Sequence, residues 1–187
     1  MRRLVLILWI ALPFAVGLYC VWRFYDWRDH SQDGPILAAA RRFAIPPALV
    51  KAVVWRESRF NAKARGTKGE IGLMQIMPQA AAQDWADALH MPPLTPEQLA
   101  VPETNTLIGA WFLAKLSKRY PKADDPFPFV LADYNAGRGN VLKWAHGAAA
   151  TNSAAFIEQI GFPGTKQYVL KVMERYRYYR PIFPPQS

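Results

Sequence analysis

The sequence predicts an all-α protein, and three observations support that prediction. From about residue 35 onward, apolar residues recur at helical spacing, and no stretch shows the sustained alternation that predicts a strand. Prolines and glycines, 16 and 11 residues, punctuate the chain between the helical stretches. Hydrophobic residues make up 51% of the 187 residues, which is enough to bury one core. A single helical domain with an N-terminal appendage is therefore expected.

The first expected element is an uncharged run over residues 4–22, which follows Arg2 and Arg3 and ends before Arg23. Its 19 residues approach the roughly 20 that cross a bilayer, whereas the apolar core of a signal peptide usually has about 7 to 15. We therefore expect residues 1–23 to form one transmembrane helix that anchors the chain. The alternatives are a cleaved signal sequence, for which residues 15–17 make a poor cleavage site, and a buried core helix.

The rest of the chain is expected to consist of a polar linker over residues 24–34 and one helical domain over residues 35–187. In each expected helix the apolar residues follow helical spacing, and the two prolines at 46–47 suit a helix start. The helices are expected over residues 36–43, 47–58, 78–88, 102–119, 128–135, 140–146, 154–160 and 165–179.

Charge and ligand chemistry narrow the function classes. The net charge of +9 favours an acidic partner: nucleic acid, an anionic membrane surface or a carboxylate-rich wall polymer. Nucleic acid is disfavoured, because the one basic cluster, residues 175–180, lies at a helix end where basic residues are common. Cys20 is the only cysteine, and His30, His90 and His146 show no paired ligand spacing. No metal and no cofactor are expected.

Glu57 is the leading candidate for acid-base chemistry. Val50, Val53 and Val54 lie seven, four and three residues before it, on the same face of the expected helix 47–58. A carboxylate presented from such an apolar stripe is partly desolvated, which raises its pKa toward the range of a general acid near neutral pH. Helix geometry alone leaves open a structural ion pair with a nearby arginine, Arg56, Arg59 or Arg65.

Several stretches around Glu57 form a recognisable series. Glu57 and Ser58 close one expected helix, GLMQIMP follows at residues 72–78, and ADYNAG follows at 132–137. Two weaker stretches are PETN at 102–105, before a helix containing Gly109 and Ala110, and residues 160–169, which end in Tyr168 and Val169. In this order and separation they resemble the signature of the lysozyme-like lytic transglycosylases of the soluble, SLT type. The resemblance spans about residues 49–179 and implies a lysozyme-like catalytic domain.

The resemblance also implies roles for individual residues. Glu57 would be the catalytic acid and base, and the Tyr134 hydroxyl would lie near the reacting sugar or the Glu57 carboxylate. Substrate-binding roles are implied for Ser58, Gly72, Met74, Gln75, Tyr134, Asn135 and Tyr168. Without the resemblance, Met74 is a typical core residue, Gln75 a surface amide and residues 135–137 a helix stop.

Three positions depart from the family pattern. Gly66 stands where the family often has serine, Gly164 where it often has glutamate before a threonine, and Asp133 where alanine is commoner before Tyr134. The two glycines are expected to change how the substrate is positioned, and Asp133 would add a second carboxylate near the site. Glu57 is unaffected.

The implied reaction is the non-hydrolytic cleavage of the β-1,4 bond from N-acetylmuramic acid to N-acetylglucosamine in peptidoglycan, which leaves 1,6-anhydromuramic ends. Most glycosidases use two carboxylates, whereas this reaction needs Glu57 alone. A hydrolytic muramidase on the same fold is the alternative, and it would recruit Glu70, Asp84, Asp87 or Asp133 to activate water. A non-catalytic wall-binding or assembly factor is a further alternative.

The expected location and partners follow from the N-terminal run and the implied wall substrate. The chain is expected to be a single-pass inner-membrane protein with its catalytic domain in the periplasm, or a secreted periplasmic protein if the first residues are cleaved. Its expected partners are peptidoglycan glycan strands and the membrane, without nucleic acid. A protein partner from an envelope machine stays open, as does the choice between general wall turnover and local clearing of the wall.

Overall fold

The structure, a computed structural model, describes the backbone of residues 2–183 and the side chains of residues 12–183. Over these residues its regular elements are helices, joined by turns and loops, and two isolated antiparallel bridges pair Arg65 with Ile71 and Ile71 with Ile76. These bridges lie in the loop between residues 59 and 77. The all-α prediction is confirmed.

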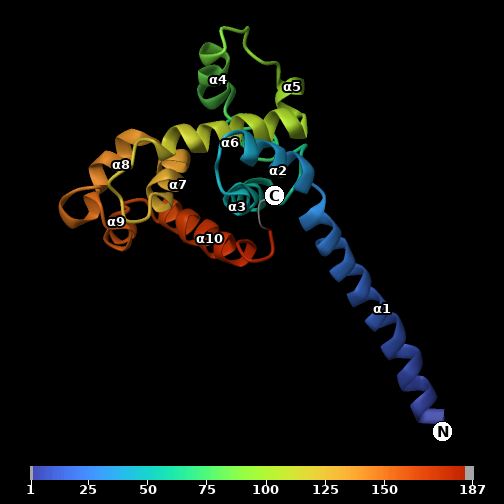
Figure 1. Ribbon diagram of the computed structural model, residues 1–187. Helices are drawn as coiled ribbons and strands as arrows, with labels where there is room; N and C mark the ends of the chain where they lie inside the picture. Colours follow the sequence, from blue (N-terminus) through green and yellow to red (C-terminus); the bar gives the residue numbers. More distant parts are fainter. Residues whose placement is uncertain (1, 184–187) are drawn as a thin grey trace.

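The N-terminal helix α1 (Arg2–His30) points away from the rest of the molecule (Figure 1). Residues 24–30 of the expected linker are the last part of this helix, and only a short turn separates it from α2 (Asp33–Arg42). No glycine or proline interrupts residues 18–33, and Arg23 pairs with Asp26 one turn later at 3.1 Å. These residues therefore continue the helix instead of forming an irregular linker.

The membrane span expected over residues 4–22 stays a prediction. Residues 4–11 lie outside the residues whose side chains the structure describes, and the side chains at 12–22 are all exposed. No helix within the described part of the chain is long and apolar enough to cross a membrane.

Helix α3 (Pro47–Ser58) lies at the centre of the domain (Figure 1). It packs against α2, α6 (Pro102–Ser117) and α10 (Pro163–Tyr179), and α10 also packs against α7 (Phe127–Ala136). Its apolar residues from Leu49 to Val54 are fully buried, and the one charged residue among them, Lys51, is buried as well, so this part of the helix has no exposed polar face. This central position fixes the direction in which the end of α3 presents Glu57.

Shorter helices surround this core. They are the π-helical turn η1 (Pro78–Ala82), α4 (Gln83–Ala88), α5 (Pro96–Ala100), α8 (Arg138–Trp144), the 3-10 turn η2 (Gly147–Ala150) and α9 (Ser153–Gln159). The expected helix 78–88 is thus split into a π-helical turn and α4. Helix α5 is too short for a periodic pattern, but Thr95 and Gln98 form a capping box at its start.

Lys51 ties the end of α1 to the core. It is almost fully buried in α3, and its Nζ lies 2.6 Å from Asp33 Oδ1 and 3.7 Å from Asp29 Oδ2. The Tyr179 hydroxyl also donates to Asp29. A buried ammonium left without these carboxylates would be strongly destabilising, so the last turn of α1 is an integral part of the domain.

Candidate active site

The C-terminal end of α3 presents Glu57. The helix stops because Arg59 and Phe60 take left-handed conformations, with φ of 52° and 63°. Just before this turn, the Ser58 hydroxyl donates to the carbonyl of Leu73 at 2.8 Å and to that of Val54 at 3.2 Å. Ser58 is buried, and it joins α3 to the glycine-rich loop. The substrate-binding role expected for Ser58 does not fit this burial.

The loop over residues 71–77 faces the end of α3 and is held by Asn105. This fully buried amide accepts from Met74 N at 2.8 Å and donates to the carbonyls of Ile71 at 2.8 Å and Leu99 at 2.7 Å. Gly72 has a φ of +79°, and a Cβ there would collide with the Asn105 side chain. Glycine is therefore required for both conformation and space.

The structure places Met74 in the core instead of in the groove. Its side chain is fully buried and packs so closely on Gly109 that a Cβ at position 109 would overlap its sulfur. Only the backbone of Met74 serves the site, because its carbonyl accepts from the Tyr134 hydroxyl at 2.7 Å. The substrate-binding role expected for this side chain does not fit its burial.

Two tyrosines from other helices complete the surroundings of Glu57. The hydroxyl of Tyr168 on α10 donates to Glu57 Oε1 at 2.7 Å, although 111 residues separate the two. Tyr134 on α7 lies within the electrostatic influence of the Glu57 carboxylate, whose charge helps to raise the pKa of the phenol, and its hydroxyl donates to the Met74 carbonyl of the loop. Asn135 beside it is exposed and accepts from Thr165 Oγ1 at 2.8 Å, which joins α7 to the start of α10.

The electrostatics suit a general acid. Burial raises the pKa of Glu57 from 4.5 to about 7, opposed by the Tyr168 hydrogen bond and the charge of Arg56, while the charge of Glu70 raises it further. The pKa values of Tyr134 and Tyr168 are raised well above 10, mainly by burial, so both phenols stay neutral. Among the described residues Glu57 forms no salt bridge. The raised pKa predicted from the sequence is confirmed, and the alternative of a structural ion pair is not supported.

The pH dependence of activity should report these contacts. A general acid must be protonated, so kcat/KM should fall as pH rises through about 7. Tyr168→Phe removes a hydrogen bond to the charged form, so the alkaline limb should move to higher pH. Glu70→Gln removes a like charge, so the limb should move to lower pH. Rate profiles of the three proteins test this, and shifts in the same direction would contradict the assignment.

A cavity of about 280 Å³ continues the site beyond Glu57. Gln75, Tyr134 and Phe112 line it, together with Arg119 and Arg138. Gln75 also donates from Nε2 to the Gly72 carbonyl at 2.9 Å, which orients its amide. Both Gln75 and Tyr134 were expected to bind substrate, and both line this cavity.

Most of the carboxylates that a muramidase could use to activate water already bond to other side chains. Asp133 is buried and bonds to Arg119 Nη1 at 2.8 Å and to the Tyr120 hydroxyl at 2.6 Å. Asp84 pairs with Lys115 at 2.7 Å, and Asp87 accepts from Gln83 at 2.7 Å. Within residues 12–183 no group of three or more His, Cys, Asp or Glu side chains could hold a metal ion.

Glu70 is the last of these candidate carboxylates, and the position of its side chain explains why residue 66 is a glycine. A Cβ on Gly66 would overlap the Glu70 carboxyl group and lie 2.9 Å from Gln75 Oε1. Glu70 is held in place by the backbone N–H of Lys68, which donates to Oε2 at 2.9 Å. Glu70 therefore occupies the space of a side chain at position 66, where the SLT family often has serine. Gly164 is different, because a Cβ there would meet no atom within 4 Å.

Gly66 and Glu70 should behave as a coupled pair. Gly66→Ser should displace the Glu70 side chain and lower the free energy of unfolding by about 1 kcal/mol. In the Glu70→Ala background the same serine should cost almost nothing, because the space is then free. Denaturant unfolding of the two single variants and the double variant measures the coupling, and strictly additive effects would contradict the overlap.

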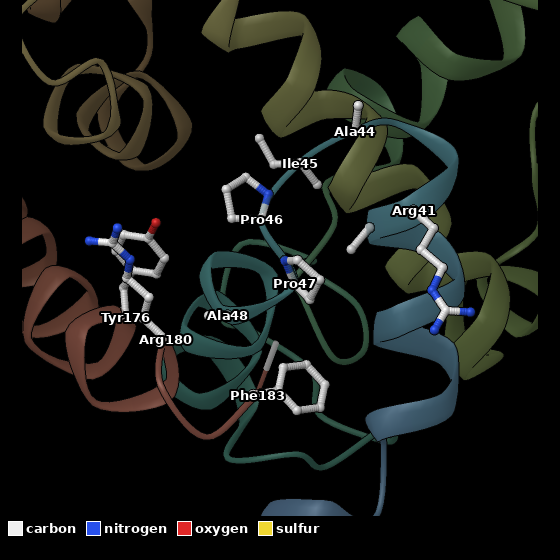
Figure 2. A pocket seen from close by; sticks show the side chains of 10 residues that line it. Arg41, Ala44, Ile45, Pro46, Pro47, Ala48, Tyr176, Arg180 and Phe183 are labelled. Atoms are coloured by element: carbon white, nitrogen blue, oxygen red, sulfur yellow. The ribbon is translucent and has the colours of Figure 1, made fainter. Parts of the chain in front are cut away.

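A second cavity, of about 520 Å³, lies at the opposite end of α3 (Figure 2). Pro46, Pro47 and Phe183 contribute to its apolar wall, and Tyr176 and Arg180 approach from α10. None of the described residues lining it is a carboxylate. It therefore lacks an acid for glycoside chemistry, and the candidate active site lies at the Glu57 end of α3.

The sequence did not indicate how three residues shape the site. Asn105 belongs to the weaker PETN stretch at 102–105, which gave it no role of its own, and Glu70 was named only as a carboxylate that a muramidase could recruit. Thr165 was noted only as the threonine after Gly164, and its partner Asn135 lies 30 residues away in the sequence.

With this geometry in place, comparison with known proteins decides the family. The family model of the transglycosylase SLT domain matches residues 34–157. The chain belongs to the SLT transglycosylase family. Its fold is accordingly the all-α, lysozyme-like fold implied by the sequence motifs.

Individual proteins similar to this chain support the same family assignment. The chain is 36% identical to the soluble lytic murein transglycosylase of Escherichia coli K12 over 138 residues, which are 73% of this chain and 21% of that protein. The membrane-bound lytic murein transglycosylase C of Shigella sonnei is 29% identical, over 72% of this chain and 39% of its own. An X-ray structure of an inactive glutamate-to-glutamine mutant of the lytic transglycosylase Slt from Pseudomonas aeruginosa superposes with a TM-score of 0.71 and 28% identity, over 82% of this chain and 24% of that one. The chain thus spans less than two fifths of the length of each of these relatives.

Proposed function

We propose that this chain is a peptidoglycan lytic transglycosylase, and the arrangement of Glu57 carries the proposal. One carboxyl group with a pKa of about 7 lies at the end of a buried helix and accepts from Tyr168. Such a group can donate a proton near neutral pH and take one back within the same cycle. Membership of the SLT family and the lytic murein transglycosylases among its relatives support the same activity.

In the proposed reaction, Glu57 protonates the oxygen of the glycosidic bond from N-acetylmuramic acid to N-acetylglucosamine, and that bond breaks. The acetamido group of the muramic residue stabilises the positive charge at the anomeric carbon. The Glu57 carboxylate then removes the proton of the muramic 6-hydroxyl, whose oxygen bonds to the anomeric carbon. Glu57 ends protonated, and no water is consumed. The Tyr168 hydrogen bond orients the carboxyl group throughout.

The hydrolytic muramidase is less well supported. It needs a second carboxylate to activate water. Asp84, Asp87 and Asp133 are engaged with other side chains, and Glu70 is held by the Lys68 backbone. The non-catalytic wall-binding factor is also less well supported, because it gives no reason for the raised pKa of Glu57.

Mass analysis of muropeptides released from purified peptidoglycan tests the activity. Anhydro-ended products are expected, whereas reducing ends would identify a muramidase. The full chain in detergent is the right sample, because removing residues 1–33 would deprive buried Lys51 of Asp29 and Asp33. A folded protein that binds glycan without cleaving it would support the binding factor instead.

We further propose that residues 1–23 anchor the chain in the inner membrane, with the domain over residues 35–187 in the periplasm. The uncharged run over residues 4–22 and the exposed apolar side chains of α1 from Leu12 onward support this. A membrane-bound relative in the same family is consistent with it. Carbonate extraction of cell membranes tests the anchor: the full chain should stay in the pellet, and release into the supernatant would contradict it.

A further inference from the structure

A cavity of about 660 Å³ lies where α1 meets the domain. The last turns of α1, the residues around the end of α3 and the end of α10 form its walls, and Arg28, Arg59 and Arg175 all line it. Glu57 does not line it, so it is separate from the active site. The cavity contains more positive charge than its own carboxylates balance.

The three arginines lack acidic partners. None of them forms a salt bridge within the described part of the chain. The carboxylates of the cavity, Asp26 and Asp29, are paired with Arg23 at 3.1 Å and with Lys51 at 3.7 Å. Burial lowers the pKa of Arg59, and the positive charges of Arg175, Arg56 and Arg28 lower it further. An anion in this cavity would relieve that repulsion.

Trp55 holds two of these guanidinium groups in place. Arg59 Cζ lies 3.6 Å and Arg175 Cζ 4.2 Å from its ring centroid. Cation-π contact with a ring face orients a guanidinium group while its N–H edge stays available. Planar N–H edges suit the oxygen atoms of a phosphate, which arginine can bind in a bidentate manner.

The rim of the cavity is apolar and aromatic. Trp22 and Tyr25 on α1, and Tyr178 and Ile182 at the end of α10, all line it and are each more than half exposed. Trp22 is also the last residue of the uncharged run in α1. Tryptophan and tyrosine beside arginine at the end of an apolar helix are typical of the membrane interface.

We propose that this cavity binds the phosphate headgroup of an anionic phospholipid, so that the ends of α1 and α10 rest together on the bilayer surface. The membrane role of the cavity rests on the anchor proposed above, whereas the unpaired arginines and the exposed aromatic rim are observed in the structure. Bound headgroup would fix the orientation of the catalytic domain relative to the membrane.

The test compares two short-chain lipids with identical acyl chains, phosphatidylglycerol and phosphatidylcholine, added to the full chain in nonionic detergent. Binding is measured by titration calorimetry and by the shift in thermal unfolding temperature. Phosphatidylglycerol should bind at least tenfold more tightly, because only it carries net negative charge. Equal binding of the two lipids would overturn the proposal without any variant.

Variants then locate the site. The double substitution Arg59→Gln, Arg175→Gln should weaken phosphatidylglycerol binding at least tenfold, and Arg177→Gln should not, because Arg177 is exposed on α10 but does not line the cavity. If the glutamine double variant fails to fold, the double variant Arg59→Lys, Arg175→Lys is used instead. It keeps the charge and should lose part of the preference for phosphatidylglycerol over phosphatidylcholine. Unchanged binding in a folded pair would overturn the proposal.

Glycerol phosphate distinguishes a lipid from a soluble anion. If it displaces phosphatidylglycerol at equal concentration, the site recognises a soluble phosphate and the membrane role is wrong. These measurements are made in detergent and need neither a spanning helix nor peptidoglycan cleavage. Failure of the anchor in carbonate extraction, or of the activity in product analysis, is therefore separable from failure of the headgroup site.

Discussion

Glu57→Gln should lower the turnover of peptidoglycan roughly 10²- to 10⁴-fold, the usual range for loss of a positioned general acid-base group. The amide keeps the size of the side chain and can still accept from Tyr168, but it can neither donate the proton to the leaving oxygen nor take one from the 6-hydroxyl. Release of anhydro-muropeptides over time measures the effect. Glu174→Gln, at an exposed position on α10, is the matched control and should retain full activity.

The same variant should be more stable than the wild type at alkaline pH. The folded pKa of about 7 exceeds the ordinary value of 4.5, so burial of the charged form weakens the fold progressively as pH rises from about 4.5 to about 7. Glu57→Gln should therefore raise the unfolding temperature at pH 8 and leave it nearly unchanged at pH 4. Activity that survives the substitution, or a lower unfolding temperature at pH 8, would show that Glu57 has a different role.

Asn105→Ala should cost about 3 to 5 kcal/mol in the free energy of unfolding, because it leaves three buried backbone groups without partners. These groups are the N–H of Met74 and the carbonyls of Ile71 and Leu99. The glycine-rich loop should loosen as well, so activity should fall even at temperatures where the domain stays folded. Denaturant unfolding and product release measure the two effects.

Asn61→Ala provides the contrast for this prediction. Asn61 is exposed and its side chain accepts a single hydrogen bond, from Lys63 N at 3.0 Å, so its loss should cost less than about 1 kcal/mol. A similar cost for both substitutions would mean that the Asn105 contacts do not organise the loop.

The main helices of the domain could be predicted because their patterns are local. The expected helix over residues 47–58 matches α3, and its run of buried apolar residues is visible in the sequence. Residues 24–30 were misplaced because charged and aromatic residues resemble a linker in composition, while the absence of glycine and proline favours helix. Helix α5 was missed because five residues cannot show a period.

Site residues were predictable by type and order but not by role. The motifs selected Glu57, Gln75 and Tyr134, all of which contribute to the site. They also selected Ser58 and Met74, whose side chains are buried and serve packing and loop attachment. A motif marks residues that a family keeps together, and it does not separate those that touch substrate from those that hold the groove in place.

The sequence by itself determined the all-α class, the helix that carries Glu57 and the apolar stripe from which its carboxyl group is presented, because apolar spacing within a helix is a local pattern. Only the tertiary structure decided that Tyr168 is the hydrogen-bond partner of Glu57, that Asn105 holds the glycine-rich loop, and that Glu70 fills the space beside Gly66. The first contact joins residues from two helices, the second joins a helix to a loop, and the third depends on how one loop folds back on itself. Hydrophobic spacing along the chain contains no information about which polar groups such folding brings within about 3 Å of one another.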